Sequence, residues 1–257
     1  MLNLELGFVL AAAFGAGLID AMAGGGGLIM LPALFAAYPQ VPHPTLLGTG
    51  KVASLAGSAS AIARYAGHVR LDWPLLATAS FSAFAASLVG AWIATQISPA
   101  RFRAIVPVIL AAVVLYTLLH RDFGSLHEPR HLGRGGRVYA ALGSAAIGAY
   151  DGFFGPGAGS FLAFMFVRGF GFDFLHATAS AKVVNAAANA AAILMFGITG
   201  KLYWLLGLAM AACAMLGAQI GSHIAIRRGS GFVRIVFLLV VGSLIAKTAV
   251  DAWHAAH

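Results

Sequence analysis

Long apolar stretches, most of them about the length of a membrane-spanning helix, constrain how this chain can fold more than any other feature. None of the long stretches alternates polar with apolar residues, so β-strands are not indicated. Several exceed the roughly 20 residues that cross a hydrocarbon core, and backbone at that depth must satisfy its own hydrogen bonds. The sequence therefore predicts an all-α, polytopic transmembrane bundle of about 8–10 membrane segments, in which the two short segments, 27–38 and 158–170, either span or re-enter. The apolar stretches are 5–23, 27–38, 44–66, 73–97, 102–119, 138–154, 158–170, 174–198, 203–226 and 232–250.

Charged residues are too few to cover a globular surface in water. Only 9% of the 257 residues are charged and 60% are hydrophobic, whereas soluble domains carry about 25% charged residues. The net charge of +8 does not indicate nucleic-acid binding, because the basic residues lie between apolar stretches rather than in one patch. In a membrane protein such residues mark the cytoplasmic side, and the expected partner is the lipid bilayer.

The chain contains an internal repeat with an offset of 131 positions. Ungapped agreement at spaced polar, glycine and tryptophan positions predicts a duplicated unit, which is common in secondary transporters. We expect a first transmembrane repeat over 1–119, a basic cytoplasmic linker over 120–137 and a second repeat over 138–257. The matching pairs are Asp20 and Asp151, Lys51 and Lys182, Trp73 and Trp204, Gly90 and Gly221, and Arg103 and Arg234.

The basic residues also predict how the halves are oriented. If all ten segments cross, ten Lys and Arg residues fall on the side of the linker and three on the other side, in line with the positive-inside rule. Five crossings per half make the repeats inverted, and the parity survives if each short segment forms a re-entrant hairpin with its predecessor. It does not survive if only the short segment fails to cross. Inversion would place Trp73 and Trp204 at opposite membrane interfaces.

Glycine motifs in matching places predict two broken helices. Residues 24–27 are all glycine and residues 155–157 read Gly-Pro-Gly; Gly costs about 1 kcal/mol and Pro about 3 kcal/mol relative to Ala inside a helix. A short helix should begin after each break, and its free N–H groups and partial positive charge favour an anion. The alternative is that these glycines only permit close helix packing.

Four charged residues lie within the apolar stretches. Asp20 and Asp151 stand just before the breaks, and Lys51 and Lys182 lie well inside the third segment of each half. Such charges are costly in a membrane and suggest a functional site. The aspartates could carry a coupling proton or cap N–H groups at the breaks. The lysines could flank one central anion or form structural ion pairs with the aspartates.

Polar residues around the lysines complete the candidate site. Serines or asparagines follow each lysine at i+3 and i+7 and share its helix face. No metal site, cofactor site or nucleophile–base constellation is indicated, so we do not expect an enzyme. The expected substrate-binding residues are Lys51, Lys182, Gly24, Gly25, Gly26, Gly27, Gly155, Gly157, Ser160, Thr49, Ser54, Ser58, Asn185 and Asn189, and Asp20 and Asp151 are expected to couple protons or cap the breaks.

Three of these motifs resemble a known family over essentially the whole chain. Asp20-Ala-Met-Ala-Gly24, Gly48-Thr-Gly-Lys51 and Tyr150-Asp-Gly-Phe-Phe-Gly155-Pro-Gly are similar to the paired signatures of the sulfite exporter TauE/SafE family. The resemblance implies a multi-pass transporter of the bacterial inner membrane, with about eight transmembrane helices, for small anions such as sulfite, sulfoacetate or sulfonates. The family usually has Asn before the first lysine, where this chain has Gly50, which removes one polar contact.

The residues and the resemblance together predict a secondary transporter of a small sulfur oxyanion or organosulfur anion, with proton-coupled export. An anion channel and a non-transporting membrane accessory protein are the alternatives. Flux with and without a pH gradient would separate a carrier from a channel. Assembly as a homodimer stays open.

Overall fold

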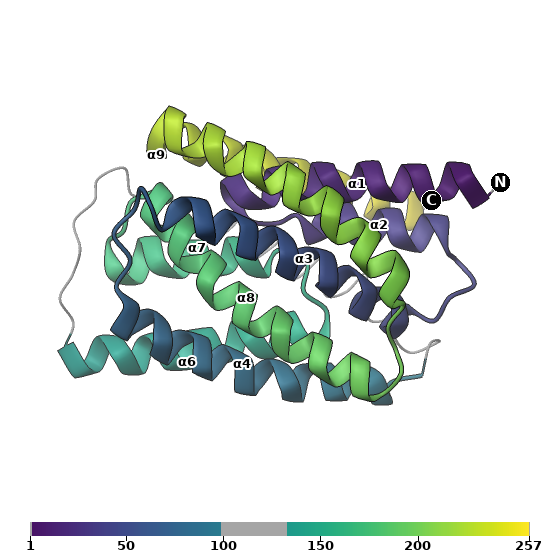
Figure 1. Ribbon diagram of the computed structural model, residues 1–257, viewed down its shortest axis with the longest axis horizontal. Coiled ribbons are helices and arrows are strands. Elements are labelled where there is room, and N and C mark those ends of the chain that lie inside the picture. The colour runs from purple at the N-terminus through teal and green to yellow at the C-terminus, as the bar shows by residue number, and fades with distance from the viewer. Residues whose placement is uncertain (1, 99–132, 257) are drawn as a thin grey trace.

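A computed structural model describes residues 2–98 and 133–256, and within these ranges the chain forms helices and no β-strand (Figure 1). The predicted all-α transmembrane bundle is confirmed. The helices are α1 (Leu2–Ala23), α2 (Gly27–Ala37), α3 (His43–Tyr65), α4 (Trp73–Gln96), α6 (Gly133–Phe153), α7 (Ala158–Phe170), α8 (Phe174–Ile198) and α9 (Trp204–Ala256).

Four of the described segments are long and apolar enough to cross a membrane. They are Leu4–Ala23, Trp73–Gln96, Phe174–Ile198 and Trp204–Val233. Helix α3 has 23 residues and is long enough, but its glycine, serine and threonine residues and Lys51 lower its hydropathy. The helix with the most polar sequence in the first half is therefore also one that carries candidate site residues.

Some expected boundaries shift. Helix α6 begins at Gly133, so residues 133–137 of the expected linker are helical, and the rest of the linker and the expected segment 102–119 lie outside the described residues. The expected segments 203–226 and 232–250 both fall within α9, apart from Tyr203, and α9 has 53 residues. Non-helical backbone at Gly229 (φ 74°, ψ −175°) divides α9, and a positive φ of this kind is accessible to glycine without a steric penalty.

The helix starts repeat with the offset seen in the sequence. Helices α2, α3 and α4 begin 131 positions before α7, α8 and α9 respectively. The halves therefore share one order and spacing of helices, although the inversion of one half across the bilayer stays a prediction.

Two helices begin with an aspartate cap. Asp72 caps α4 by accepting from the Leu75 N–H at 3.2 Å, and Asp173 caps α8 by accepting from the His176 N–H at 2.8 Å.

The two halves interlock. Helix α1 packs along α9 and α6 packs along α4, with α3 and α8 between these two layers (Figure 1). Glycines make both interfaces close: a Cβ atom at Gly90 would collide with the Ala149 carbonyl oxygen, and one at Gly221 would collide with that of Leu18. Both partners of one contact lie 131 positions from their counterparts in the other. Such reciprocal exchange is what a two-fold relation between the halves produces.

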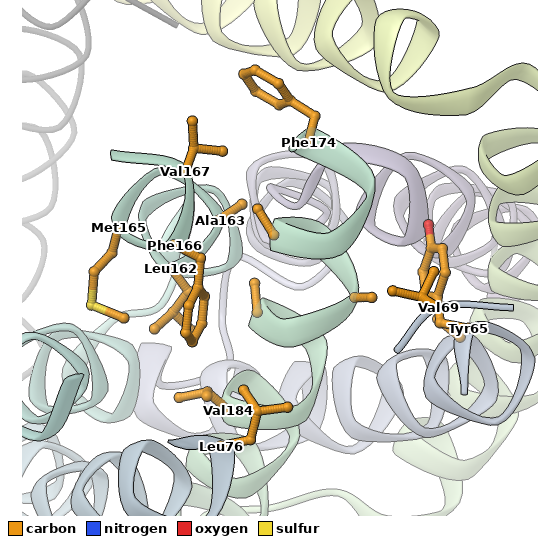
Figure 2. Packing of buried hydrophobic residues seen from close by; sticks show 14 of the residues in the cluster. Tyr65, Val69, Leu76, Leu162, Ala163, Met165, Phe166, Val167, Phe174 and Val184 are labelled. Carbon is orange, nitrogen blue, oxygen red and sulfur yellow. The ribbon is translucent and has the colours of Figure 1, made fainter. Parts of the chain in front are cut away.

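Two apolar clusters flank the centre of the bundle. One gathers residues of α7 and α8 with Tyr65 of α3 and Leu76 of α4; Figure 2 shows Val184 of α8 next to Leu76, with Leu162 and Phe166 of α7 nearby. The other joins α1, α2 and α3 to α9. Large hydrophobic side chains also remain exposed on the outer helices, as expected for surfaces that face lipid.

Candidate functional site

Both glycine motifs break a helix, as predicted. Gly24 and Gly25 have φ angles of 77° and 84° between α1 and α2. Gly155 and Gly157 have φ angles of 101° and 84° between α6 and α7. These left-handed values are readily adopted only by glycine. Helices α2 and α7, with 11 and 13 residues, are only about 17 and 20 Å long at 1.5 Å per residue, too short to cross a core of about 30 Å alone.

The two breaks pack against each other. A Cβ atom at Gly24 would lie 2.5 Å from the Ser160 backbone nitrogen, and one at Gly27 would lie 3.4 Å from the Pro156 Cα. The Ser160 hydroxyl donates to the Ala23 carbonyl at 3.2 Å. The end of α1 therefore contacts the start of α7, and the starts of the two short helices lie next to each other.

Both lysines are buried, and each forms an ion pair with the aspartate of the opposite half. Lys51 Nζ lies 2.7 Å from Asp151 Oδ1, and Lys182 Nζ lies 2.5 Å from Asp20 Oδ2. These contacts form the ion-pair arrangement considered for the lysines, and their contact with a central anion stays a prediction. The four charges sum to zero, which lowers the penalty for burying them.

The two aspartates differ in their other oxygen. Asp20 Oδ1 accepts from the Gly26 N–H at 3.2 Å, so Asp20 caps the first break. Asp151 Oδ2 is buried and has no hydrogen-bond partner among the described residues. Of the two aspartates considered as caps, only Asp20 therefore makes a capping hydrogen bond among the described residues.

A small cavity, partly open to its surroundings, lies between the halves. Both glycine breaks and polar residues of α3 and α8 border it, so most of the predicted site is brought together. Its lining residues are Asp20, Gly25, Gly27, Met30, Leu31, Leu47, Gly50, Lys51, Ser54, Asp151, Phe154, Gly155, Gly157, Gly159, Asn185 and Asn189.

Asparagine side chains supply hydrogen-bond donors at this cavity. Asn185 Oδ1 accepts from the Ser58 hydroxyl at 3.4 Å and from Asn189 Nδ2 at 3.0 Å. With its oxygen occupied, Asn185 has its amide N–H groups left to donate. Lys51, Ser54 and Asn185 therefore place an ammonium, a hydroxyl and an amide around one small space, which is a donor set suited to an oxyanion.

Six predicted site residues do not line this cavity, for reasons that the contacts make plain. Thr49 Oγ1 donates to the Thr45 carbonyl and accepts from the Tyr203 N–H, so it ties α3 to the start of α9. Lys182 is held by Asp20. The Ser58 hydroxyl donates to Asn185 Oδ1, and the Ser160 hydroxyl donates to the Ala23 carbonyl. Gly24 packs against α7, and Gly26 borders a smaller neighbouring cavity with Asp20 and Ser54.

The apolar wall was not predicted. Met30, Leu31, Leu47 and Phe154 line the cavity, but an apolar residue in a membrane helix gives no signal of facing a ligand rather than lipid. Gly50 also lines the cavity, and a Cβ atom added there would lie 3.3 Å from Leu31 Cδ2. The position where the family usually has Asn is therefore a wall position. Within the described residues, no group of three His, Cys, Asp or Glu side chains could hold a metal ion.

Comparison with known families gives one match that covers most of the chain. The profile of the family described as sulfite exporter TauE/SafE matches residues 9–248. No solved structure matches the chain significantly.

Curated relatives match along almost their full length. The chain is 38% identical over 251 residues to a probable membrane transporter protein, ORF9, of a Sinorhizobium species, covering 97% of this chain and 94% of that protein. It is 36% identical to the probable membrane transporter protein YfcA of Escherichia coli K12, covering 97% and 91%. A probable membrane transporter protein of Haemophilus influenzae is 32% identical, with 96% and 95% covered.

Proposed function

Because the chain belongs to the sulfite exporter TauE/SafE family of membrane transporters, we propose that it carries a small anion through the cavity between its two halves. It is a multi-pass membrane protein and not an enzyme. The observation that supports the proposal best is the position of Lys51, a buried ammonium on the wall of a partly open cavity. A cation at membrane depth that borders solvent-accessible space is a binding group by default.

The proposed cargo is a sulfur oxyanion or an organosulfur anion such as sulfite, sulfoacetate or another sulfonate. Ser54 and Asn185 offer hydrogen-bond donors close to Lys51, and the short helices α2 and α7 begin at the cavity. The start of a helix contributes N–H groups and a partial positive charge. A tetrahedral or pyramidal oxyanion with several acceptor oxygens would satisfy these donors together.

We further propose proton-coupled export across the bacterial inner membrane. The support is the presence of two aspartates beside the lysines, since a carboxylate that gains and loses a proton can couple anion movement to a pH difference. The homodimer stays a separate proposal, which the size of the purified protein in detergent would test.

Flux into proteoliposomes tests the proposed function. The purified chain is reconstituted, and uptake of sulfite, ethanesulfonate and acetate is measured with and without a pH difference. A carrier shows faster uptake when unlabelled anion is present on the opposite side, whereas a channel does not. Protein-free vesicles are the control. Equal flux of every anion in both preparations would contradict transport and favour the accessory-protein alternative.

A further inference from the structure

The two lysine–aspartate pairs occupy equivalent places, but they are not equivalently satisfied. Asp20 uses both oxygens, one for Lys182 and one for the Gly26 N–H. Its side chain is also 18% exposed, so its charge is partly hydrated. A carboxylate with two donors and some water is well stabilised in its ionised form.

Asp151 is in a poorer environment for a negative charge. Its side chain is only 3% exposed, Lys51 holds Oδ1, and Oδ2 has no partner in the described part of the chain. In the second break, the Tyr150 hydroxyl next to it in the chain donates to the Pro156 carbonyl and not to Asp151. A buried acceptor without a partner costs about 1–3 kcal/mol, and more when it is charged.

The two lysines also differ in their access to the cavity. Lys51 lines the cavity together with Asp151, whereas Lys182 is 1% exposed and does not line it. A Cβ atom at Gly155 would lie 2.7 Å from Lys51 Nζ, so the second break leaves room for the ammonium. An anion that enters the cavity can reach Lys51, whose partner is Asp151. The carboxylate of Asp20 also borders the cavity, but it is paired with Lys182.

We propose that these pairs have different tasks: Asp151 takes up a proton and releases Lys51 to the transported anion, whereas Lys182 and Asp20 form a fixed pair that holds the first helix break. This assignment rests on the proposed function and specifies its coupling residue. In the empty site, the ammonium of Lys51 and the carboxylate of Asp151 sum to zero charge. In the loaded site, a proton from solution has bound to Asp151, and a monoanion lies beside Lys51 where the Asp151 carboxylate was. The charges again sum to zero.

Charge balance fixes the stoichiometry. One proton and one monoanion move together in the same direction, and neither form of the site carries a net charge through the membrane. At equilibrium, a difference of one pH unit therefore accumulates the anion about tenfold on the alkaline side, since one pH unit is worth 1.36 kcal/mol per proton. The membrane potential contributes nothing to this accumulation. Net export therefore occurs when the cytoplasmic excess of the anion is larger than the ratio set by the pH difference, and each exported anion carries one proton out with it.

Matched variants in proteoliposomes test the assignment, with ethanesulfonate as the probe because it does not titrate near neutral pH. The wild type should accumulate ethanesulfonate about tenfold across one pH unit. Asp151→Asn should exchange internal for external ethanesulfonate but no longer accumulate it. Without the Asp151 carboxylate, the empty site carries the unbalanced charge of Lys51, so it can cross to the other side only with the anion bound. Asp20→Asn should still accumulate it and should have a lower melting temperature.

Each outcome has a clear consequence. Accumulation by Asp151→Asn, or equal behaviour of the two variants, overturns the assignment of tasks while leaving anion transport intact. A wild type that moves none of the tested anions overturns both proposals.

If Asp151→Asn does not fold, wild-type protein in weakly buffered detergent provides the second measurement. About one proton should be taken up for each ethanesulfonate bound, and binding without proton uptake overturns the assignment.

Discussion

The two halves of this protein have the same helix order and very different surroundings for the same residue. Lys51 and Lys182 lie at matching positions in α3 and α8, yet only Lys51 borders the cavity. On the first-half side, Leu31, Leu47 and Gly50 form the wall. Their counterparts, Leu162, Thr178 and Ala181, do not line the cavity. Duplication thus fixed where the backbone breaks, and side-chain packing decided which copy stays accessible.

The largest expected effect concerns the orientation of the two halves in the membrane, which cysteine labelling from one side either detects or does not. Trp73 and Trp204 are the first residues of α4 and α9 and are 54% and 53% exposed. In a Cys213→Ala background, Trp73→Cys and Trp204→Cys should react with an impermeant maleimide from opposite sides of the membrane. Labelling of both from one side would show that the repeats are parallel.

Close helix packing should respond equally in both halves. Gly90→Leu and Gly221→Leu would each drive a side chain into the backbone of a neighbouring helix, and overpacking of this kind destabilises by about 1–3 kcal/mol or more. We expect little monodisperse protein in detergent from either variant. Gly15→Leu on α1 is the control, since no atom of the described residues, apart from the backbone of its own helix, lies within 4 Å of the added Cβ. Loss of one variant alone would contradict the two-fold relation.

The lysines should respond unequally. Removing one partner of a buried pair costs about 3–5 kcal/mol because a charge is left alone. We expect Lys182→Ala to lower the melting temperature strongly, while the protein that remains folded transports. Lys51→Ala should lower the melting temperature less than Lys182→Ala does, because water in the cavity can reach the space that the ammonium leaves. It should nevertheless lose anion flux. Wild-type flux from Lys51→Ala would remove its substrate role.

The smallest effect is expected from the hydroxyl on the cavity wall. Ser54→Ala removes one donor, which is worth about 1 kcal/mol, so the apparent affinity for the anion should fall about fivefold. Thr49→Ser is the control, since it keeps the hydroxyl that ties α3 to α9, outside the cavity. Uptake measured over a range of ethanesulfonate concentrations distinguishes the two, and equal affinity in both would place the anion elsewhere.

The helix breaks and the duplication could be predicted from the sequence because each depends on a few distinctive residues. Four consecutive glycines, or Gly-Pro-Gly, cannot continue a helix cheaply, and an offset shared by Asp20 and Lys51 exposes the duplication. The segments that carry α2 and α7 were found in place, with their short length.

The details of the site were less accessible. The sequence could suggest that lysines pair with aspartates, but it could not show that each pair crosses between the halves, because that depends on interlocked packing. Nor could it show that Thr49 turns towards α9 or that Met30 faces the cavity. One helix face has several polar neighbours, and only the packed structure decides which neighbour each side chain meets.

The crossed ion pairs also have a consequence for how the protein is made. Asp20 and Lys182 are 162 positions apart, and the partner of Lys51 lies in α6, which is synthesised after the whole first half. While the ribosome is still producing the second half, the first half holds an unmatched aspartate and an unmatched lysine, and a lone charge at the centre of a membrane helix is unfavourable by about 3 kcal/mol on insertion scales. We therefore expect a truncated chain that ends before α6 to be removed by membrane proteases. Supplying the second half as a separate polypeptide should protect it.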